Sequence, residues 1–169
     1  MSRRALLLTA ILILGTGCGG PTSPDSGSAQ AIVENAMATI TVNGAAVQSG
    51  STVTVSVGAT VSYRYDFRNN SGQVFHDGIV IVRDDGPEQL IMCGASASGG
   101  DGGASGVSSS IFPNHPIYTP GHTVRVYLLG ALGPNVQTGP GQCYLQLSLG
   151  VPNHANVQTQ RLLVTLTVQ

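Results

Sequence analysis

Apolar and polar residues alternate with a period of two along most of this chain, which predicts short β-strands. The clearest case is the segment Val61–Arg68, where an aromatic-rich row alternates with a polar and charged row. Successive side chains of a strand point to opposite faces, so we expect Tyr63, Tyr65 and Phe67 to pack in a core. A ligand groove is the alternative for these rings. The other row, with Arg64 and Asp66, is expected to be a solvated face with weak ion pairs rather than a ligand patch.

Further strands are predicted at 38–42, 52–57, 74–83, 90–93, 124–128, 143–149 and 162–168. Within 74–83, the run from Ile79 to Val82 is apolar on both faces, which is typical of a central strand. Turn-forming residues separate the strands, for example Asn43-Gly44, Asn69–Gly72 and Asp84–Pro87. No segment has the period of a long amphipathic helix, and residues 32–34 fit either a helical turn or a strand lead-in. The pattern predicts an all-β domain at 35–169, a two-sheet antiparallel sandwich of seven to nine strands.

The segment 94–110 interrupts this pattern. It reads GASASGGDGGASGVSSS and has no apolar residues at a core-forming spacing. Long stretches of this kind inside a compact domain are usually functional or disordered loops. We therefore expect a mobile surface loop at these residues.

The N-terminal stretch has a different character. Arg3-Arg4 precedes an apolar run, Ala5–Leu14, and the small residues Gly15-Thr16-Gly17 follow before Cys18. A basic start, a short apolar run and small residues are typical of a secretory signal peptide, here 1–17. The run is too short to span a membrane, which takes about 20 apolar residues. A buried core helix is the alternative.

The order of small residues before Cys18 resembles the lipobox of bacterial lipoproteins. That resemblance implies cleavage before Cys18, acylation of its thiol and amine, including by palmitate, and a lipid anchor in the cell envelope. Gly15 departs from the pattern, since the family usually has Leu there, and ordinary cleavage giving a secreted protein is the alternative. The segment 18–34 begins with a tract rich in Gly, Ser and Pro, so we expect a lipidated Cys and a flexible linker there.

With Cys18 assigned to the anchor, Cys93 and Cys143 remain. An even pair in an oxidising compartment predicts a disulfide. In the predicted strand 143–149, Cys143 shares a face with three leucines, so we expect a buried crosslink between the two sheets. A two-thiol metal site is the alternative, but neither cysteine has a His or Cys neighbour at ligand spacing.

The composition excludes some function classes. All seven basic residues are arginines, set against eight acidic residues, and they form no basic patch. Nucleic-acid binding therefore lacks its electrostatic signature. No nucleophile elbow, zinc-protease motif or phosphate-binding loop is present. We accordingly predict no catalytic residues and no cofactor.

The histidines are the one cluster that could carry chemistry. Pro113-Asn114-His115 and Pro152-Asn153-His154 repeat a tripeptide in two loops. If the loops at one end of a sandwich converge, His76, Asp77, His115, His122 and His154 are candidate metal ligands. Their spacing matches no local metal motif, and independent loop and strand histidines are the favoured interpretation.

Several motifs resemble bacterial immunoglobulin-like domains of the cell-adhesion-related (CARDB) kind. They are Gly58–Tyr63 followed by Arg68–Gly72, and the later segments Pro120–Val124 and Pro140–Tyr144. The tryptophan that packs on a disulfide in antibody domains is missing, and the Gly-rich segment 94–110 is an addition. The resemblance implies an immunoglobulin-like sandwich that acts as a non-catalytic binding, adhesion or structural module. We expect a protein or polysaccharide of the envelope or cell surface as its partner. A histidine-based metal-binding or enzymatic envelope protein is the alternative.

Overall fold

The computed structural model describes residues 27–86, 88–96, 101–107, 119–135, 143–145 and 156–169. The elements in chain order are α1 (Ala29–Asn35), β1 (Met37–Val42), β2 (Ala45–Val47), β3 (Ser51–Val55), β4 (Val61–Arg68), β5 (Val74–Arg83), β6 (Glu88–Ser96), β7 (Asp101–Val107), β8 (Thr123–Gly133) and β9 (Thr159–Val168). In this described part of the chain, no helix is long and apolar enough to cross a bilayer. The predicted signal peptide, 1–17, and Cys18 lie outside it.

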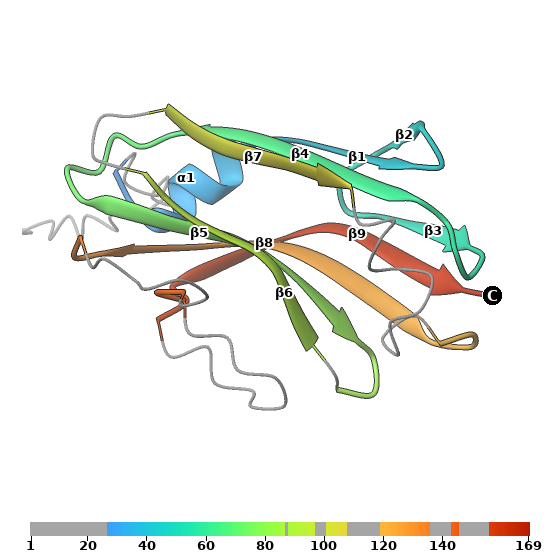
Figure 1. Ribbon diagram of the computed structural model, residues 1–169. Helices are drawn as coiled ribbons and strands as arrows, with labels where there is room; N and C mark the ends of the chain where they lie inside the picture. Colours follow the sequence, from blue (N-terminus) through green and yellow to red (C-terminus); the bar gives the residue numbers. More distant parts are fainter. Residues whose placement is uncertain (1–26, 87, 97–100, 108–118, 136–142, 146–155) are drawn as a thin grey trace, which may run out of the picture.

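The strands form two sheets packed face to face (Figure 1). The four-stranded sheet has the order β2-β1-β4-β7 and the five-stranded sheet has the order β3-β9-β8-β5-β6. The predicted all-β, two-sheet architecture is therefore confirmed. The expectation of a wholly antiparallel sandwich is wrong, because β3 runs parallel to β9, with Ser51 beside Val164 and Val55 beside Val168. These two strands are far apart in the sequence, so no hairpin turn fixes their relative direction.

The main core lies between the two sheets. The aromatic row of β4 packs there as predicted, with Tyr65 and Phe67 buried and Tyr63 half-buried. The ring of Phe67 meets Phe75 of β5 edge to face at a centroid distance of 4.8 Å. In the opposite row of β4 the two arginines are exposed and Ser62 and Asp66 are half-buried. Arg64 forms an ion pair with Asp66 on this solvent-facing side.

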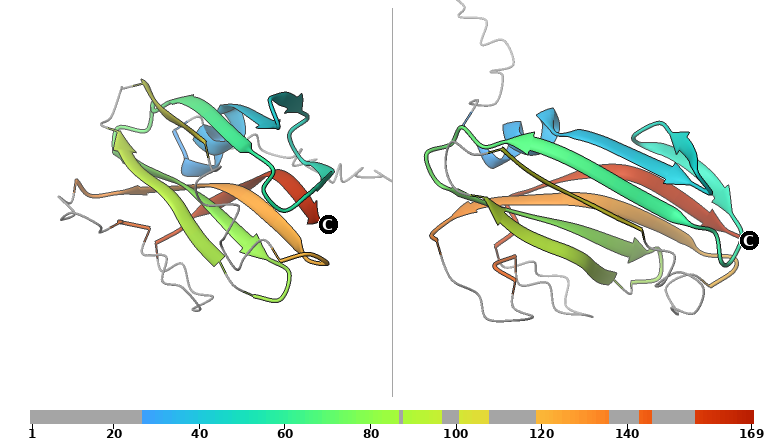
Figure 2. Two further views of the ribbon diagram at one scale, coloured as in Figure 1. Left: turned by 45° about the vertical axis from the view of Figure 1, so that its right-hand side comes forward. Right: turned by 45° about the horizontal axis from the view of Figure 1, so that its top comes forward.

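Helix α1 closes one end of this core, at the opposite end of the sandwich from the C-terminus (Figures 1 and 2). Ser28 caps the helix, since its Oγ accepts a hydrogen bond from Ala31 N at 3.1 Å. Ile32 and Val33 are buried against the sheets. Gly130 of β8 provides the space, because a Cβ at this position would lie 2.5 Å from Val33 Cγ2.

The C-terminal end of α1 is held by Arg161 of β9. Its guanidinium donates hydrogen bonds to the carbonyl oxygens of Val33, Glu34 and Ala36 at 3.3, 3.1 and 2.7 Å. The last carbonyls of a helix have no partner within the helix, and a cation there also interacts favourably with the helix dipole. The predicted linker, 18–34, is therefore too long: the described residues from 28 onward belong to the folded domain, because Ile32 and Val33 supply apolar surface to the core.

The outer face of the five-stranded sheet carries a second, smaller core. Val80 of β5 and Leu129 and Ala131 of β8 are buried there under Leu145. Strand β5 is thus buried on both faces, which confirms that the apolar run Ile79–Val82 belongs to a central strand.

Two predictions for the later part of the chain are wrong. The expected loop 94–110 contains the end of β6 and strand β7, which pairs with β4 from Ser62 beside Val107 to Arg68 beside Asp101. Small residues suit this strand, because a Cβ at Gly102 would lie 2.5 Å from the ring of Phe67. The expected strand 143–149 is wrong for Cys143–Leu145, which do not form a strand, and its remaining residues lie outside the described part.

We predict that Arg161→Ala lowers the free energy of unfolding by about 2 kcal/mol, since three carbonyl oxygens lose a charged donor. The change should appear in denaturant unfolding, and hydrogen exchange should show faster exchange in α1 than in the sheets. Arg125→Ala, at an exposed position of β8, is the matched control and should change stability little. Equal losses in the two variants would contradict this role for Arg161.

Candidate functional site

Among the described residues, the structure does not bring the predicted metal candidates together. His76 and Asp77 are consecutive buried residues of β5, so their side chains lie on opposite faces. Asp77 faces the main core, where the hydroxyl of Tyr65 donates a hydrogen bond to its carboxylate. His76 lies on the outer side and stacks on Tyr144 at a centroid distance of 4.0 Å. The two side chains therefore cannot share a metal ion.

The remaining candidates are also separated. His122 lies just before β8, near the turn that follows β5, and thus at the other end of β5 from His76. His115 and His154 lie outside the described residues. The convergence of loops that the sequence suggested is not found among the candidates that can be placed.

The predicted disulfide between Cys93 and Cys143 is present, with a Cα–Cα distance of 6.0 Å. Its predicted position between the two sheets is wrong. Both cysteines pack against the second core, on the outer face of the five-stranded sheet. Cys93 comes from β6, an edge strand of that sheet, and Cys143 comes from the connection between β8 and β9. The crosslink therefore fastens this connection to the five-stranded sheet and does not join the two sheets.

Residues Cys143–Leu145, which we call the strap, cover the outer face through several further contacts. Leu145 is fully buried in the second core. The ring of Tyr144 stacks on His76 and fills the space over Gly133, where a Cβ would lie 2.5 Å from the ring. The carbonyl oxygen of Tyr144 accepts a hydrogen bond from Asn156 Nδ2 at 2.6 Å. The polar groups here serve packing and show no reactive arrangement.

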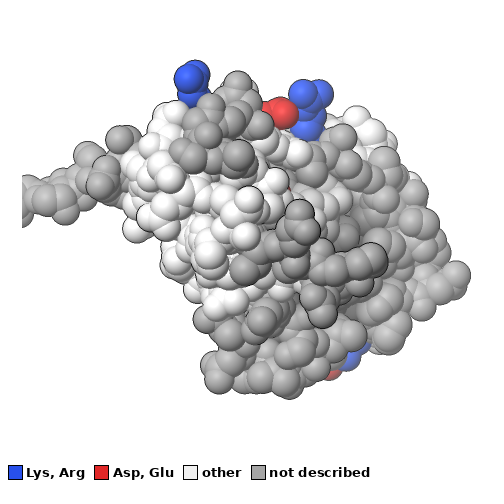
Figure 3. Space-filling model, turned by 60° about the vertical axis from the view of Figure 1, so that its left-hand side comes forward, with Lys and Arg blue, Asp and Glu red and all other residues white. Residues whose placement is uncertain are grey.

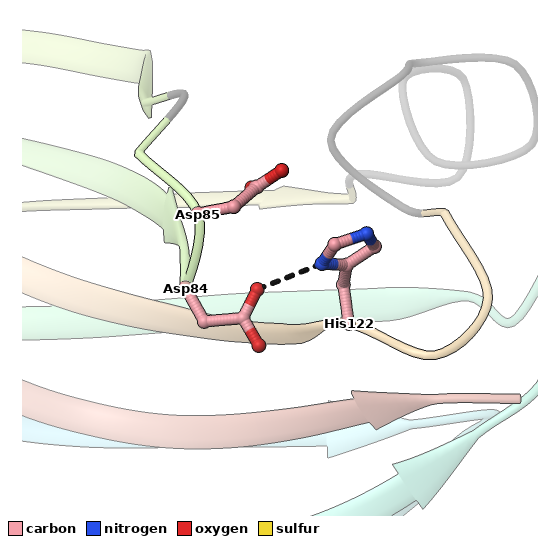
Figure 4. Close-up of side chains that lie close together, drawn as sticks. All are labelled: Asp84, Asp85 and His122. Atoms are coloured by element: carbon pink, nitrogen blue, oxygen red, sulfur yellow. Dashed lines mark hydrogen bonds and ion pairs between the residues drawn. The ribbon is translucent and has the colours of Figure 1, made fainter.

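A cluster that the sequence did not single out lies at the end of the sandwich opposite α1. Asp84 and Asp85, in the turn after β5, and His122, before β8, offer ligand atoms that all lie within 4.8 Å of one another (Figure 4). His122 Nδ1 is 2.9 Å from Asp84 Oδ1, and Thr123 N donates to Asp84 Oδ2 at 3.0 Å. The arrangement resembles a metal site in residue type and in proximity.

The carboxylates of this cluster already have partners. The hydrogen bond from His122 lowers the pKa of Asp84, with a further contribution from the Thr123 amide. The guanidinium of Arg83 forms a forked ion pair with Asp85 and lowers the pKa of that carboxyl. Arg83 also donates to Thr119 Oγ1 at 3.1 Å. A metal cation would have to displace Arg83 and His122 from these carboxylates. The geometry therefore favours a structural contact that holds the two turns together.

An open cleft of about 430 Å³ lies beside the start of β1. It is lined by Asn35, Met37, Asp66, Phe67, Arg68 and Gly102. Met37 is 74 % exposed, which makes it the most exposed large apolar side chain of the described part. The described part of the face in Figure 3 carries few charged side chains. The cleft holds one carboxylate and one guanidinium, and it contains no nucleophile with an adjacent base.

Comparison of this chain with protein-family models and with curated protein sequences finds no match. The function of this protein therefore has to be inferred from its own residues and their arrangement. Sequence reasoning missed Asp84 and Asp85 as neighbours of His122, because it assigned them only to a turn. Two acidic residues at the end of a central strand were the available signal, but only the pairing of β5 with β8 brings His122 beside them.

We predict that replacing Cys93 and Cys143 with Ser lowers the free energy of unfolding by about 4 kcal/mol, the value expected for a crosslink between residues 50 positions apart. Urea unfolding of the oxidised protein and of the double variant measures this difference. Because the strap covers only the outer face, the double variant should keep its β-sheet circular dichroism and gain binding of a hydrophobic dye. An unchanged unfolding midpoint would contradict the role of the crosslink.

Proposed function

We propose that this protein is a lipid-anchored domain of the bacterial cell envelope, with an immunoglobulin-like fold and a non-catalytic binding or structural role. The observation that carries the proposal is the position of α1. The element that follows the predicted anchor and linker is fixed into one end of the sandwich by Arg161. A tether from Cys18 would therefore reach the domain at the α1 end and leave the opposite end pointing away from the membrane.

The strand order supports the immunoglobulin-like part of the proposal. The order β9-β8-β5-β6 matches the G-F-C-C′ order of a variable-type sandwich, and β1-β4-β7 matches A-B-E. The crosslink differs from the antibody pattern, in which a disulfide joins strands B and F, here β4 and β8. In this chain it joins β6 to the connection after β8. Fold similarity of this kind supports a module class and no particular partner.

The end away from α1 is the surface that such a module would offer to a partner. Figure 1 shows the β1–β2 turn and the ends of β3 and β5 at this end of the sandwich. Asn43 lies in the β1–β2 turn, and the exposed Val57 follows β3. Asp84 and Asp85 follow β5 and lie beside His122. Binding surfaces built on loops over a rigid scaffold are common, because loops tolerate sequence change while the sheets hold them in place. We propose an envelope protein or a surface polysaccharide as the partner.

We predict that the protein takes up labelled palmitate in a bacterial host and partitions into the detergent phase of Triton X-114, because acyl chains add membrane affinity of about 0.8 kcal/mol per buried methylene. Cys18→Ser should abolish labelling and move the protein to the aqueous phase. Ser23→Ala, in the same linker, is the control and should behave as the wild type. An unmodified mature N-terminus downstream of Cys18 in mass spectrometry would contradict the anchor and favour a secreted protein.

The closeness of the carboxylates to His122 supports a second candidate function, the binding of a divalent cation by Asp84, Asp85 and His122. Carboxylate oxygen and imidazole nitrogen together suit zinc and related transition metals.

For this second candidate we predict that Zn²⁺ at one hundred times its dissociation constant raises the free energy of unfolding by about 2.7 kcal/mol. Asp85→Asn and His122→Ala should each reduce that gain, whereas Asp66→Asn, at a carboxylate on another face, should retain it. Identical melting temperatures with Zn²⁺, with Mn²⁺ and with a chelator would rule out metal binding. The cluster would then have only the structural role of holding the two turns together.

A further inference from the structure

Asp77 is the only buried acidic side chain in the described part of the chain, with 4 % of its surface exposed. It projects from β5, in the five-stranded sheet, towards the four-stranded sheet. The hydroxyl of Tyr65, on β4, is fully buried and donates a hydrogen bond to its carboxylate. The pair is therefore a polar contact that connects the two sheets through the apolar main core.

The surroundings are shaped to hold this carboxyl group. Gly94 of β6 is paired with Asp77, and a Cβ at Gly94 would lie 3.0 Å from Oδ1 and 3.1 Å from Oδ2. On the other side, Asp77 is paired with Gly130 of β8, which also lacks a side chain. Met92 Sδ lies 3.6 Å from the hydroxyl of Tyr65. Both strands that flank Asp77 thus present glycine beside it.

Among the described residues, none of the ion pairs involves Asp77. The titratable groups near it are Tyr65 on β4 and His76 on β5 itself, whose ring lies on the opposite face. Helix α1 contributes only Glu34, which is exposed, and the facing positions of β6 and β8 are glycines. An ionised carboxylate in such a place has lost its water without gaining a counter-charge.

We propose that the Tyr65–Asp77 contact is a proton-dependent bridge between the sheets: Asp77 takes up a proton as the domain folds, so the sandwich is held most firmly in acidic surroundings. The direction follows from burial, which raises the pKa of Asp77 and outweighs the hydrogen bond from Tyr65. A carboxyl with a raised pKa in the folded state contributes its full stabilisation below the unfolded value of about 4. That contribution is lost as the pH rises through the pKa of the folded state. The fold therefore loses stability towards neutral pH, and the hydrogen bond from Tyr65 to the ionised carboxylate offsets part of that loss.

The test is urea unfolding of the oxidised protein between pH 4 and pH 8, for the wild type and for Asp77→Asn. In the pH window above 4 the unfolding constant of the wild type should rise relative to that of Asp77→Asn, by at most tenfold per pH unit, the limit for one proton. Asp84→Asn is the matched control and should leave the ratio of unfolding constants nearly constant over most of this range, because His122 lowers the pKa of Asp84 and its contribution changes with pH only near and below the unfolded value of about 4. A ratio of unfolding constants that stays constant across the range would overturn the proposal.

Tyr65→Phe separates the bridge from simple packing. The ionised carboxylate loses its donor in this variant, so the loss of stability should be larger at pH 7 than at pH 4. A loss that is the same at both pH values would show a packing role alone and would count against the bridge. If Asp77→Asn does not fold, carbon-13 NMR of the wild-type carboxyl decides, and a titration midpoint at or below about 4 would overturn the proposal.

Discussion

The requirement to bury both faces of β5 organises this molecule. Ile79 and Ile81 point into the main core, and Val80 points to the outer face of the same sheet. One sheet packed on another buries only the inner side, so a second layer has to cover the outer side. The strap provides that layer, with Leu145 fully buried in it. The strap is short, so little apolar area would hold it to the sheet. The disulfide fastens it to the edge strand β6.

The ends of the domain are held by contacts between segments that lie far apart in the sequence. Arg161 of β9 holds the C-terminal end of α1. The parallel pairing of β3 with β9 joins two other segments that are far apart in the sequence. Helix α1 is therefore held firmly in the domain, a favourable place for the proposed tether to attach. The turns at the other end are linked by the contacts among Asp84, His122 and Arg83, so they form a defined surface. This polarity of the domain is the physical basis of the proposed envelope role.

The buried polar side chains of Asn69 and Asp77 have partners from other elements. Asn69 is fully buried, and its amide donates to the carbonyl oxygens of Gln73 and, more weakly, Ser96, while its oxygen accepts from Ser71. These bonds fix the turn between β4 and β5, one of the connections at which the chain crosses from one sheet to the other. Asp77 differs from Asn69, because its partner Tyr65 is uncharged. The hydrogen bond from Tyr65 does not offset the hydration free energy that an ionised carboxylate loses on burial.

The sequence alone determined the class of fold and the strands with a clear period of two, because alternation of apolar and polar residues reports directly on local burial. It also determined that β5 is central and that Cys93 pairs with Cys143. The tertiary structure decided the rest. Strand β7 has no apolar pattern, and its place depends on the pairing with β4 and on the space that Gly102 leaves for an aromatic ring. The outer position of the disulfide and the meeting of His122 with the turn after β5 likewise depend on strand order, which local periodicity does not encode.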